Sequence, residues 1–157
     1  MKEIKLTQGK VAIVDDADFE WLSQWKWHFH HSGYAARTGS RPVQRTIHMH
    51  REVNQTPDGL STDHINGNKL DNRRENLRSC TRAENNRNIG KLANNKSGYK
   101  GVHWLKRGRR WQAQTTVAGK RVHLGVFDSA QEAAVAYDAF VLQEHGKFAR
   151  PNSVANR

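Results

Sequence analysis

The sequence predicts an α+β fold in two small parts, and three features of the chain lead to this fold class. Apolar and polar side chains alternate along residues 109–127, as in strands that bury one face. Two capping boxes, Thr81-x-x-Glu84 and Ser129-x-x-Glu132, each mark the start of a helix. Residues 88–97 are polar and lack a hydrophobic period, so we expect them to link the two parts. A chain of 157 residues has room for one or two small domains.

The composition points to an acidic polymer as partner and away from a membrane. The chain has 26 Lys and Arg against 15 Asp and Glu, a formal net charge of +11. Mean hydropathy is −0.90, and neither a membrane-spanning run nor a signal peptide is recognisable. We therefore expect a cytoplasmic protein. The single Cys80 argues against a disulfide framework or a Cys-based zinc site.

The N-terminal stretch predicts a small β-rich segment. Residues 4–6 and 11–14 flank a turn and should form a hairpin, and residues 16–22 suit one or two helical turns. Residues 25–30 and 45–51 alternate as strands would.

Aromatic and imidazole side chains are frequent in this segment. We expect Trp21, Trp25 and Trp27 to form a small core. His48 and His50 would share one face of a strand. No acidic or Cys partner completes a tetrahedral set with them, so packed or surface histidines are expected rather than a second metal site.

Residues 61–88 carry the side chains needed to cut a phosphodiester. Asp63 and Asn85 offer hard oxygen ligands of the kind that Mg²⁺ prefers. His64 has an ordinary pKa of roughly 6.5, which suits a general base near neutrality. A phosphate backbone demands positive charge, which is supplied here by Lys69, Arg73, Arg74, Arg78, Arg82 and Arg87. This stretch indicates a metal-dependent nuclease site.

Local signals place these residues on short elements. Residues 65–68 form a turn, and the first capping box predicts a helix from about Arg82 to Gly90 with Asn85 in its first turn. Neighbouring residues of a regular strand face opposite ways, so Asp63 and His64 could not both address one phosphate from such a strand. We therefore expect a strand end or a bulge at this position.

The string D-H-I-N-G-N-K-L-D-N-R-x-E-N-L, followed by A-E-N, resembles the HNH (ββα-metal) nucleases, in the phage-type branch where Asn replaces the last His. The resemblance implies that Asp63 and Asn85 bind a divalent metal, Mg²⁺ or alternatively Mn²⁺, with no zinc expected. It makes His64 the base that activates water and Asn76 the residue that braces the loop and orients His64. The dipeptide His50-Arg51 is similar to the H-R that precedes D-H in related nucleases and is kept as supporting.

The C-terminal part predicts three strands, at residues 99–104, 109–117 and 120–127, and one helix. The helix should begin after the Ser129 cap and end near His145, before Gly146. On the middle strand, we expect Trp111, Ala113, Thr115 and Val117 to point inward. They alternate with Arg110, Gln112, Gln114 and Thr116, which we expect to point outward.

Five motifs of this part resemble the AP2 DNA-binding domain in sequence and order, over residues 98–152: Y-K-G-V, W-x-A, R-V-H-L-G, F-D-S-A-x-E-A-A-x-A-Y-D and G-K-F-A-R-P-N. In that family the three-stranded sheet, packed on one helix, lies in the DNA major groove. The residues expected to contact DNA are Lys100, His103, Arg110, Gln112, Gln114, Thr116, Arg121 and His123, with Arg73, Arg74 and Arg78 on phosphates flanking the nuclease site. Several are Lys, His, Gln or Thr where plant members carry Arg, Trp or Glu, so the target sequence stays open.

The expected organisation is a β-rich segment with an HNH module at 1–90, a linker at 91–97 and an AP2-like domain at 98–157. The expected function is a bacterial or phage endonuclease that nicks double-stranded DNA at a site recognised by the AP2-like domain. A monomer is expected, with a dimer left open. The alternative is a non-catalytic, sequence-specific DNA-binding regulator. An RNA-binding module and a DNA-compacting protein are disfavoured.

Overall fold

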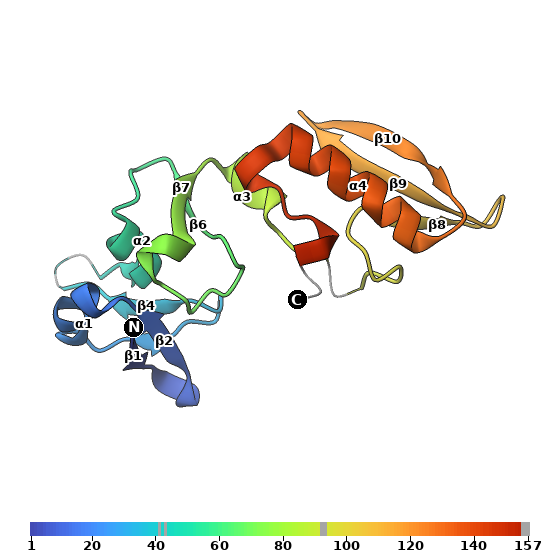
Figure 1. Cartoon of the computed structure of the whole chain (residues 1–157). Coiled ribbons are helices and arrows are strands. Elements are labelled where there is room, and N and C mark those ends of the chain that lie inside the picture. The colour runs from blue at the N-terminus through green and yellow to red at the C-terminus, as the bar shows by residue number, and fades with distance from the viewer. Residues whose placement is uncertain (41, 43, 92–93, 155–157) are drawn as a thin grey trace. The chain divides into compact units, whose positions relative to one another are not determined.

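The computed structural model describes residues 1–40, 42, 44–91 and 94–154, and the chain forms two compact units, Met1–Asn85 and Asn86–Arg157 (Figure 1). Both units combine helices with small antiparallel sheets, which confirms the α+β class. The expected linker at 91–97 groups with the second unit. Its residues 92 and 93, and residues 155–157 of the expected C-terminal domain, lie outside the described part of the chain.

The first unit opens with the expected hairpin and helix. β1 (Lys2–Lys5) pairs antiparallel with β2 (Val11–Val14) across the 3-10 turn η1 (Thr7–Gly9). Gly9 has a φ of 65°, a conformation that glycine adopts at little cost. α1 (Asp16–Ser23) follows directly.

A second sheet contains β3 (His28–Phe29), β4 (Ala35–Thr38) and β5 (Thr46–His48), and α2 (Met49–Asn54) follows β5. The strands expected at 25–30 and 45–51 are therefore wrong over most of their length. His50 and Arg51 lie on a helix.

The physical reason is that the helical period overrides the strand alternation after His48. Met49 and Val53 are four residues apart, and both are completely buried on one face of α2.

The rest of the first unit contains most of residues 61–88, the stretch that resembles a nuclease site. β6 (Ser61–His64) pairs antiparallel with β7 (Leu77–Cys80), and η2 (Arg74–Asn76) immediately precedes β7. α3 (Arg82–Arg87) follows, starting where the capping box predicts and ending before Gly90. α2 packs against both β6 and β7.

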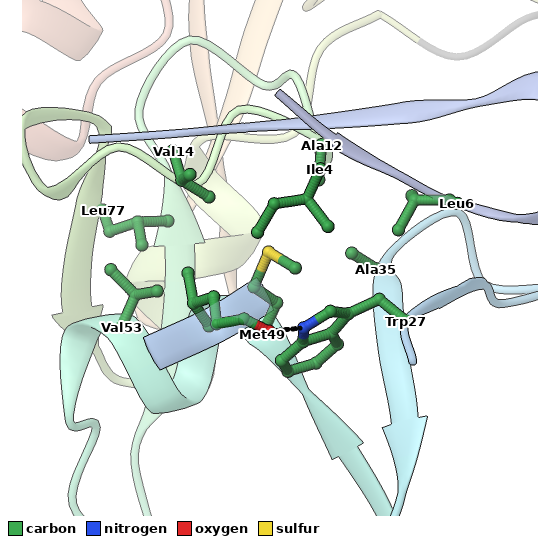
Figure 2. Packing of buried hydrophobic residues seen from close by; sticks show 10 residues of the cluster. Ile4, Leu6, Ala12, Val14, Trp27, Ala35, Met49, Val53 and Leu77 are labelled. Atoms are coloured by element: carbon green, nitrogen blue, oxygen red, sulfur yellow. Dashed lines mark hydrogen bonds between the residues drawn. The ribbon is translucent and has the colours of Figure 1, made fainter. Parts of the chain in front are cut away.

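The core of the first unit gathers side chains from β1, β2, α1, α2 and the β7 strand (Figure 2). Trp27 is buried and its indole Nε1 donates to the Leu22 carbonyl at 2.8 Å, while Trp21 packs at the edge of the cluster. The expectation for Trp25 is wrong, because this side chain is 44% exposed. Its ring instead lies 4.1 Å from the Arg37 guanidinium, a cation–π contact at the surface.

The second unit is a three-stranded sheet covered by one long helix (Figure 1). β8 (Val102–Leu105), β9 (Arg110–Val117) and β10 (Lys120–Phe127) form the order β10-β9-β8. α4 (Ala130–His145) is capped by Ser129, whose side chain accepts from the Glu132 N–H. Two 3-10 turns, η3 (Gly146–Phe148) and η4 (Asn152–Val154), follow.

Small residues allow α4 to approach the sheet. Ala133 and Ala134 are buried in a cluster with Val102, Ala113 and Tyr137. A Cβ at Gly101, whose φ is +76°, would lie 2.1 Å from the Tyr137 ring, so the sheet needs glycine there.

A bulge changes the face of one predicted inward residue. The pairing of β10 with β9 shifts between His123 and Gly125, so that Val126 lies opposite Gln112. Regular strand alternation would point Val126 inward together with Leu124, two residues before it. Val126 is 36% exposed instead, because the extra residue at the bulge moves it to the outer face of the sheet.

In the described residues, no helix combines the length and apolar character needed to cross a membrane.

Candidate active site

Asp63 and His64 occupy the last two positions of β6, opposite Arg78 and Leu77 of β7. Asp63 is 4% exposed and His64 5% exposed. The chain turns directly after His64, where the Gly67 N–H donates to the His64 carbonyl at 2.8 Å. The expected strand end is therefore confirmed.

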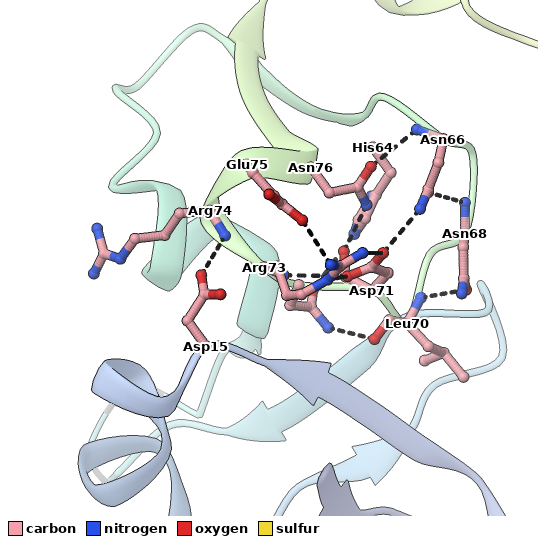
Figure 3. A network of polar contacts seen from close by, with 11 residues as sticks. Asp15, His64, Asn66, Asn68, Leu70, Asp71, Arg73, Arg74, Glu75 and Asn76 are labelled. Atoms are coloured by element: carbon pink, nitrogen blue, oxygen red, sulfur yellow. Dashed lines mark hydrogen bonds and ion pairs between the residues drawn. The ribbon is translucent and has the colours of Figure 1, made fainter. Parts of the chain in front are cut away.

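A loop follows, and Asn76 closes it from both ends (Figure 3). The Asn76 Oδ1 accepts from the Asn66 N–H at 2.9 Å, and its Nδ2 donates to the Asp71 carbonyl at 2.8 Å. The Ile65 N–H also donates to the Asn76 carbonyl at 2.9 Å. Because Asn76 is buried, these bonds hold the loop in one shape.

β2 anchors the same loop from the other side. The Ile13 N–H donates to the Leu70 carbonyl, and the Asn72 N–H donates to the Ile13 carbonyl, both at 2.8 Å. Asp71 accepts from the Asn66 amide at 2.8 Å and from the Arg73 guanidinium at 2.7 Å. The Arg73 contact lowers the pKa of Asp71, so this carboxylate stays charged and keeps its bonds.

The imidazole of His64 faces Asn72, which is completely buried. The distance from His64 Nε2 to Asn72 Oδ1 is 3.4 Å, and the Asn72 Nδ2 donates to the Leu70 carbonyl at 3.1 Å. That second bond assigns the amide orientation, and a hydrogen bond from His64 Nε2 to Asn72 Oδ1 then corresponds to the neutral tautomer with its proton on Nε2. Burial lowers the pKa of His64, while Asn72 and Asp63 act in the opposite direction.

Two further rings enclose His64. Tyr34 of the β3–β4 connection stacks on it, with ring centroids 5.7 Å apart, and His50 of α2 meets it edge-on at 5.2 Å. Burial, followed by the charges of neighbouring groups, lowers the pKa of His50 to about 3, so this imidazole is neutral near pH 7. Lys69 lies over the outer part of this group, 4.7 Å from the Tyr34 ring centroid.

His50 and Arg51, the dipeptide expected to support the site, have different roles in the structure. His50 lies beside His64, whereas Arg51 donates to the Leu60 carbonyl at 2.8 Å and the Thr56 carbonyl at 3.3 Å. Arg51 therefore fixes the turn that leads into β6.

Sequence reasoning missed Asn72 and Tyr34 as neighbours of His64. Asn72 lies within the D-N-R string quoted above, so its position in the motif was the available signal. Tyr34 is 30 positions away from His64 in sequence and carries no local signal; only the folding of the second sheet brings it there.

Arg73, Arg74 and Arg78 were expected on DNA phosphates, and all three make ion pairs with the chain's own carboxylates. Arg73 pairs with Asp71 at 2.7 Å and also with Glu75. Arg74 pairs with Asp18 at 2.7 Å. Arg78 pairs with Asp63 at 2.6 Å, across the β6–β7 hairpin.

Asn85 lies on α3, directly after the hairpin. The capping box is formed: the Thr81 N–H donates to Glu84 Oε2 at 2.7 Å, and the Glu84 N–H donates to Thr81 Oγ1 at 3.2 Å. Burial raises the pKa of the Cys80 thiol, the Asp63 charge adds to this, and the Asn85 backbone N–H opposes it. Cys80 therefore lies near the Asp63 carboxylate and the backbone N–H of Asn85.

Within the described ranges, no three or more His, Cys, Asp or Glu side chains are placed to hold a metal ion together. A hard cation is often held by only one or two protein groups and completed by water and substrate phosphate. The carboxylate of Asp63 and the amide oxygen of Asn85 have the chemistry for that kind of site.

On the second unit, seven of the eight sheet-region residues expected to contact DNA share one face. Pairing places His103 opposite Gln112, His123 opposite Gln114 and Arg121 opposite Thr116. Arg110 alternates onto the same side of β9, and the buried Ala113 marks the opposite side, against α4. Arg110 also makes an exposed ion pair with Asp128.

Lys100 is the exception, because it precedes β8 and bonds inward. Its ammonium donates to the carbonyls of Arg87 at 2.7 Å and Ile89 at 2.6 Å. Burial lowers the pKa of Lys100 to about 8, with the Arg150 charge adding to the effect.

Comparison with known proteins shows which family this part of the chain resembles. The family model described as HNH endonuclease matches residues 51–87, which contain β6, β7 and α3. Protein 3.8 of Escherichia phage T7 is 35% identical over 94 residues, covering 60% of this chain and 77% of the phage protein. The uncharacterized HNH endonuclease L560 of Acanthamoeba polyphaga mimivirus is 27% identical over 149 residues, or 94% of this chain and 77% of the viral protein.

The C-terminal portion is similar to a segment of plant proteins. APETALA2-like protein 2 of Oryza sativa subsp. indica is 42% identical over 50 residues, covering 32% of this chain and 12% of the plant protein. No solved structure matches the chain. HNH nucleases generally use a divalent metal, and membership in that family supports an enzyme over a non-catalytic regulator. The phage relative and the family model together place this chain in the HNH endonuclease family, and it is a nuclease.

Proposed function

We propose that this protein is a metal-dependent DNA endonuclease that nicks duplex DNA at a site bound by its C-terminal unit. The observation that carries the proposal is the buried Asp63–His64 pair at the end of β6, with the imidazole enclosed by Asn72, Tyr34 and His50. A site that only bound DNA would not require a neutral, buried imidazole next to a carboxylate.

Asp63 and Asn85 are the proposed metal ligands. Both offer hard oxygen atoms, which fit Mg²⁺ or Mn²⁺ and do not favour zinc. When bound, the cation would polarise the scissile phosphate and stabilise the departing 3′ oxygen.

His64 is the proposed general base. Its Nδ1 carries the lone pair, because Nε2 faces the Asn72 oxygen, and would accept the proton of the attacking water. Asn72 and Asn76 are proposed to hold this geometry, the first through the imidazole and the second through the loop. The burial that lowers the pKa of His64 favours the unprotonated form that a base requires.

The outer face of β8–β10 is the proposed DNA-reading surface, in the manner of an AP2 domain. His103, Arg110, Arg121 and His123 are exposed donors there, and the amides of Gln112 and Gln114 lie between them. Glutamine can make paired hydrogen bonds to adenine, and arginine to guanine, in the major groove. The proposed organisation remains an HNH module within 1–90, a linker at 91–97 and an AP2-like domain at 98–157.

We propose that the protein acts as a monomer. One chain would supply one base and one metal site, and such a site cuts one strand. A double-strand break would require two protomers on opposite strands, related by two-fold symmetry. A duplex labelled at both 5′ ends separates the two cases. Cutting of one strand at low enzyme supports the monomer, and simultaneous cutting of both within a palindromic footprint contradicts it.

Plasmid cleavage tests the proposed activity. Supercoiled DNA with Mg²⁺ should convert to the open-circular form, and EDTA should stop the conversion. His31→Ala is a matched control, since His31 is exposed and lies outside the proposed site. This variant should nick at the wild-type rate. Nicking that persists in EDTA would contradict a metal-dependent mechanism.

A further inference from the structure

Arg78 makes a short, buried contact with the carboxylate proposed to bind metal. Its Nε donates to Asp63 Oδ2 at 2.8 Å and its Nη2 donates to the same oxygen at 2.6 Å. The Arg78 side chain is 14% exposed and that of Asp63 is 5% exposed, so water screens the pair only weakly. A cation that binds Asp63 has to share this carboxylate with a guanidinium.

The arrangement follows from the hairpin. Asp63 and Arg78 are directly opposite each other in the β6–β7 register, so their side chains rise from the same face. Neither of the two neighbouring arginines is placed in this way. Arg73 pairs with Asp71 inside the loop, and Arg74 pairs with Asp18 of α1.

We propose that Arg78 is a positioning residue that gives up Asp63 to the metal and moves to a phosphate oxygen of the DNA, so that metal binding and DNA binding at this site are coupled. This inference rests on the proposed function, because it takes Asp63 as a metal ligand and DNA as the substrate.

Charge and geometry both support the exchange. A guanidinium at hydrogen-bond distance from Asp63 competes with a divalent cation for the same carboxylate and repels the cation. A phosphate offers Arg78 the same paired acceptor geometry as a carboxylate. DNA therefore removes the competitor at the moment when it supplies further oxygen ligands for the metal.

Linkage makes the proposal measurable. If DNA raises the affinity for metal, the metal raises the affinity for DNA by the same factor. Without the guanidinium, metal should bind more tightly to the protein alone, and DNA should then improve metal binding by a smaller factor.

The first experiment measures Mn²⁺ binding to the full-length protein without DNA, by electron paramagnetic resonance of free Mn²⁺. Arg78→Gln should bind Mn²⁺ about tenfold more tightly than wild type. Arg78→Lys, which keeps the charge but loses the paired geometry, should fall between them. Arg37→Gln is the control, since Arg37 makes a comparable half-buried pair with Glu52 at 2.8 Å, outside the site. It should leave Mn²⁺ affinity unchanged.

The second experiment repeats the titration with a bound DNA duplex, in a His64→Ala background that prevents cutting. DNA should raise Mn²⁺ affinity about tenfold or more when Arg78 is present. The factor should shrink severalfold in the His64→Ala, Arg78→Gln protein. With His64 in place, the Arg78→Gln variant should bind Mn²⁺ more tightly and cut DNA more slowly than wild type. Unfolding of the variant would weaken Mn²⁺ binding as well as cutting, so it would not produce these opposite changes.

The outcomes separate this inference from the proposed function. If Asp63→Ala leaves Mn²⁺ affinity unchanged, the metal assignment itself is wrong. If Asp63→Ala abolishes Mn²⁺ binding but Arg78→Gln binds Mn²⁺ no more tightly than wild type, the exchange is overturned and the metal assignment stands. A DNA-induced gain in Mn²⁺ affinity that is equal with and without Arg78 also overturns the exchange.

Discussion

His50 meets His64 edge-on, with ring centroids 5.2 Å apart, and joins an α2 residue to the end of β6. His50 is 6% exposed and its pKa is about 3, so it packs beside His64 as a neutral ring. The contact keeps water away from one side of His64. It also explains how His50 of the His50-Arg51 dipeptide, which lies outside the β6–β7 hairpin, contributes to the site.

The buried imidazole of His50 should make folding sensitive to acid. Its folded pKa, about 3, lies below the unfolded value of about 6.5. The unfolded chain therefore binds more protons between these values, and stability is lost as pH falls below about 6.5. Near pH 5 the loss from this group is about 2 kcal/mol.

His50→Phe keeps a ring of similar size without titrating. Urea unfolding at pH 7.5 and pH 5 should show a smaller acid loss for this variant than for wild type. The groups around His50 that also titrate or carry charge are His48, His64, Tyr34, Arg51 and Lys69, and they remain in both proteins. Equal acid losses in the two proteins would mean that His50 is not buried as a neutral group.

Local rules predicted β9, β10 and α4 well, whereas β8 (Val102–Leu105) begins three residues later than the strand expected at 99–104. β10 and α4 match the expected strand and helix, because alternation and a Ser129 cap are signals carried by neighbouring residues. The bulge at His123 was not predictable from that pattern, since it depends on pairing with β9 and moves Val126 to the outer face.

The candidate site was predicted only in part, because only some of its residues are neighbours in sequence. Asp63, His64 and Asn76 come close together from one string of sequence, and their roles remain predictions. The ring of Tyr34 and the ion pair of Arg74 with Asp18 depend on chain segments far away in sequence. The chain's composition gives charge but not the partner of each charge.

Asn72 should matter for cutting more than for DNA binding. Asn72→Ala removes the acceptor that faces His64 Nε2 but leaves the base in place, so the cutting rate should fall about 10- to 100-fold, less than or at the lower limit of the roughly 10²- to 10⁴-fold effect of losing a general base. Asn54→Ala is the control, since it removes an amide that bonds Thr56 and Ser79 instead. Single-turnover cleavage and gel-shift titrations measure the two quantities. A wild-type cutting rate for Asn72→Ala would remove this residue from the mechanism.

The metal ligands should reveal themselves through the metal requirement. Asp63→Ala or Asn85→Ala should raise the Mg²⁺ or Mn²⁺ concentration needed for half-maximal cutting, because each removes one of very few protein ligands. A cleavage titration over metal concentration measures this. Normal cutting by either variant at limiting metal would place the metal elsewhere.

The outer face of the C-terminal sheet should dominate DNA affinity. Arg121→Ala should weaken duplex binding and reduce the slope of log affinity against log salt by about one if it contacts a phosphate. If it reads a base, specificity should relax by about 1–3 kcal/mol at one position. Lys5→Ala, an exposed change on β1, is the control. Equal salt slopes and equal affinities for Arg121→Ala and Lys5→Ala would argue against this surface.

Gly101 should be the least replaceable glycine near the sheet. Gly101→Ala places a methyl group 2.1 Å from the Tyr137 ring and should destabilise the protein by roughly 2–4 kcal/mol. Gly119→Ala shares a positive φ of +78° but meets nothing within 4 Å, so it should cost about 1–2 kcal/mol. Thermal unfolding compares the two. Equal losses would contradict the close packing of α4 on the sheet.

The most direct test of the central claim is the effect of His64→Ala on cutting and on binding, measured on the same duplex. Single-turnover cleavage with saturating Mg²⁺ gives the rate, and a gel shift in Ca²⁺ gives the affinity. If His64 is the general base, the rate should fall on the order of 10²-fold or more while affinity changes little. If cutting and binding fall together, or if the variant cuts at the wild-type rate, His64 is not the base of this nuclease.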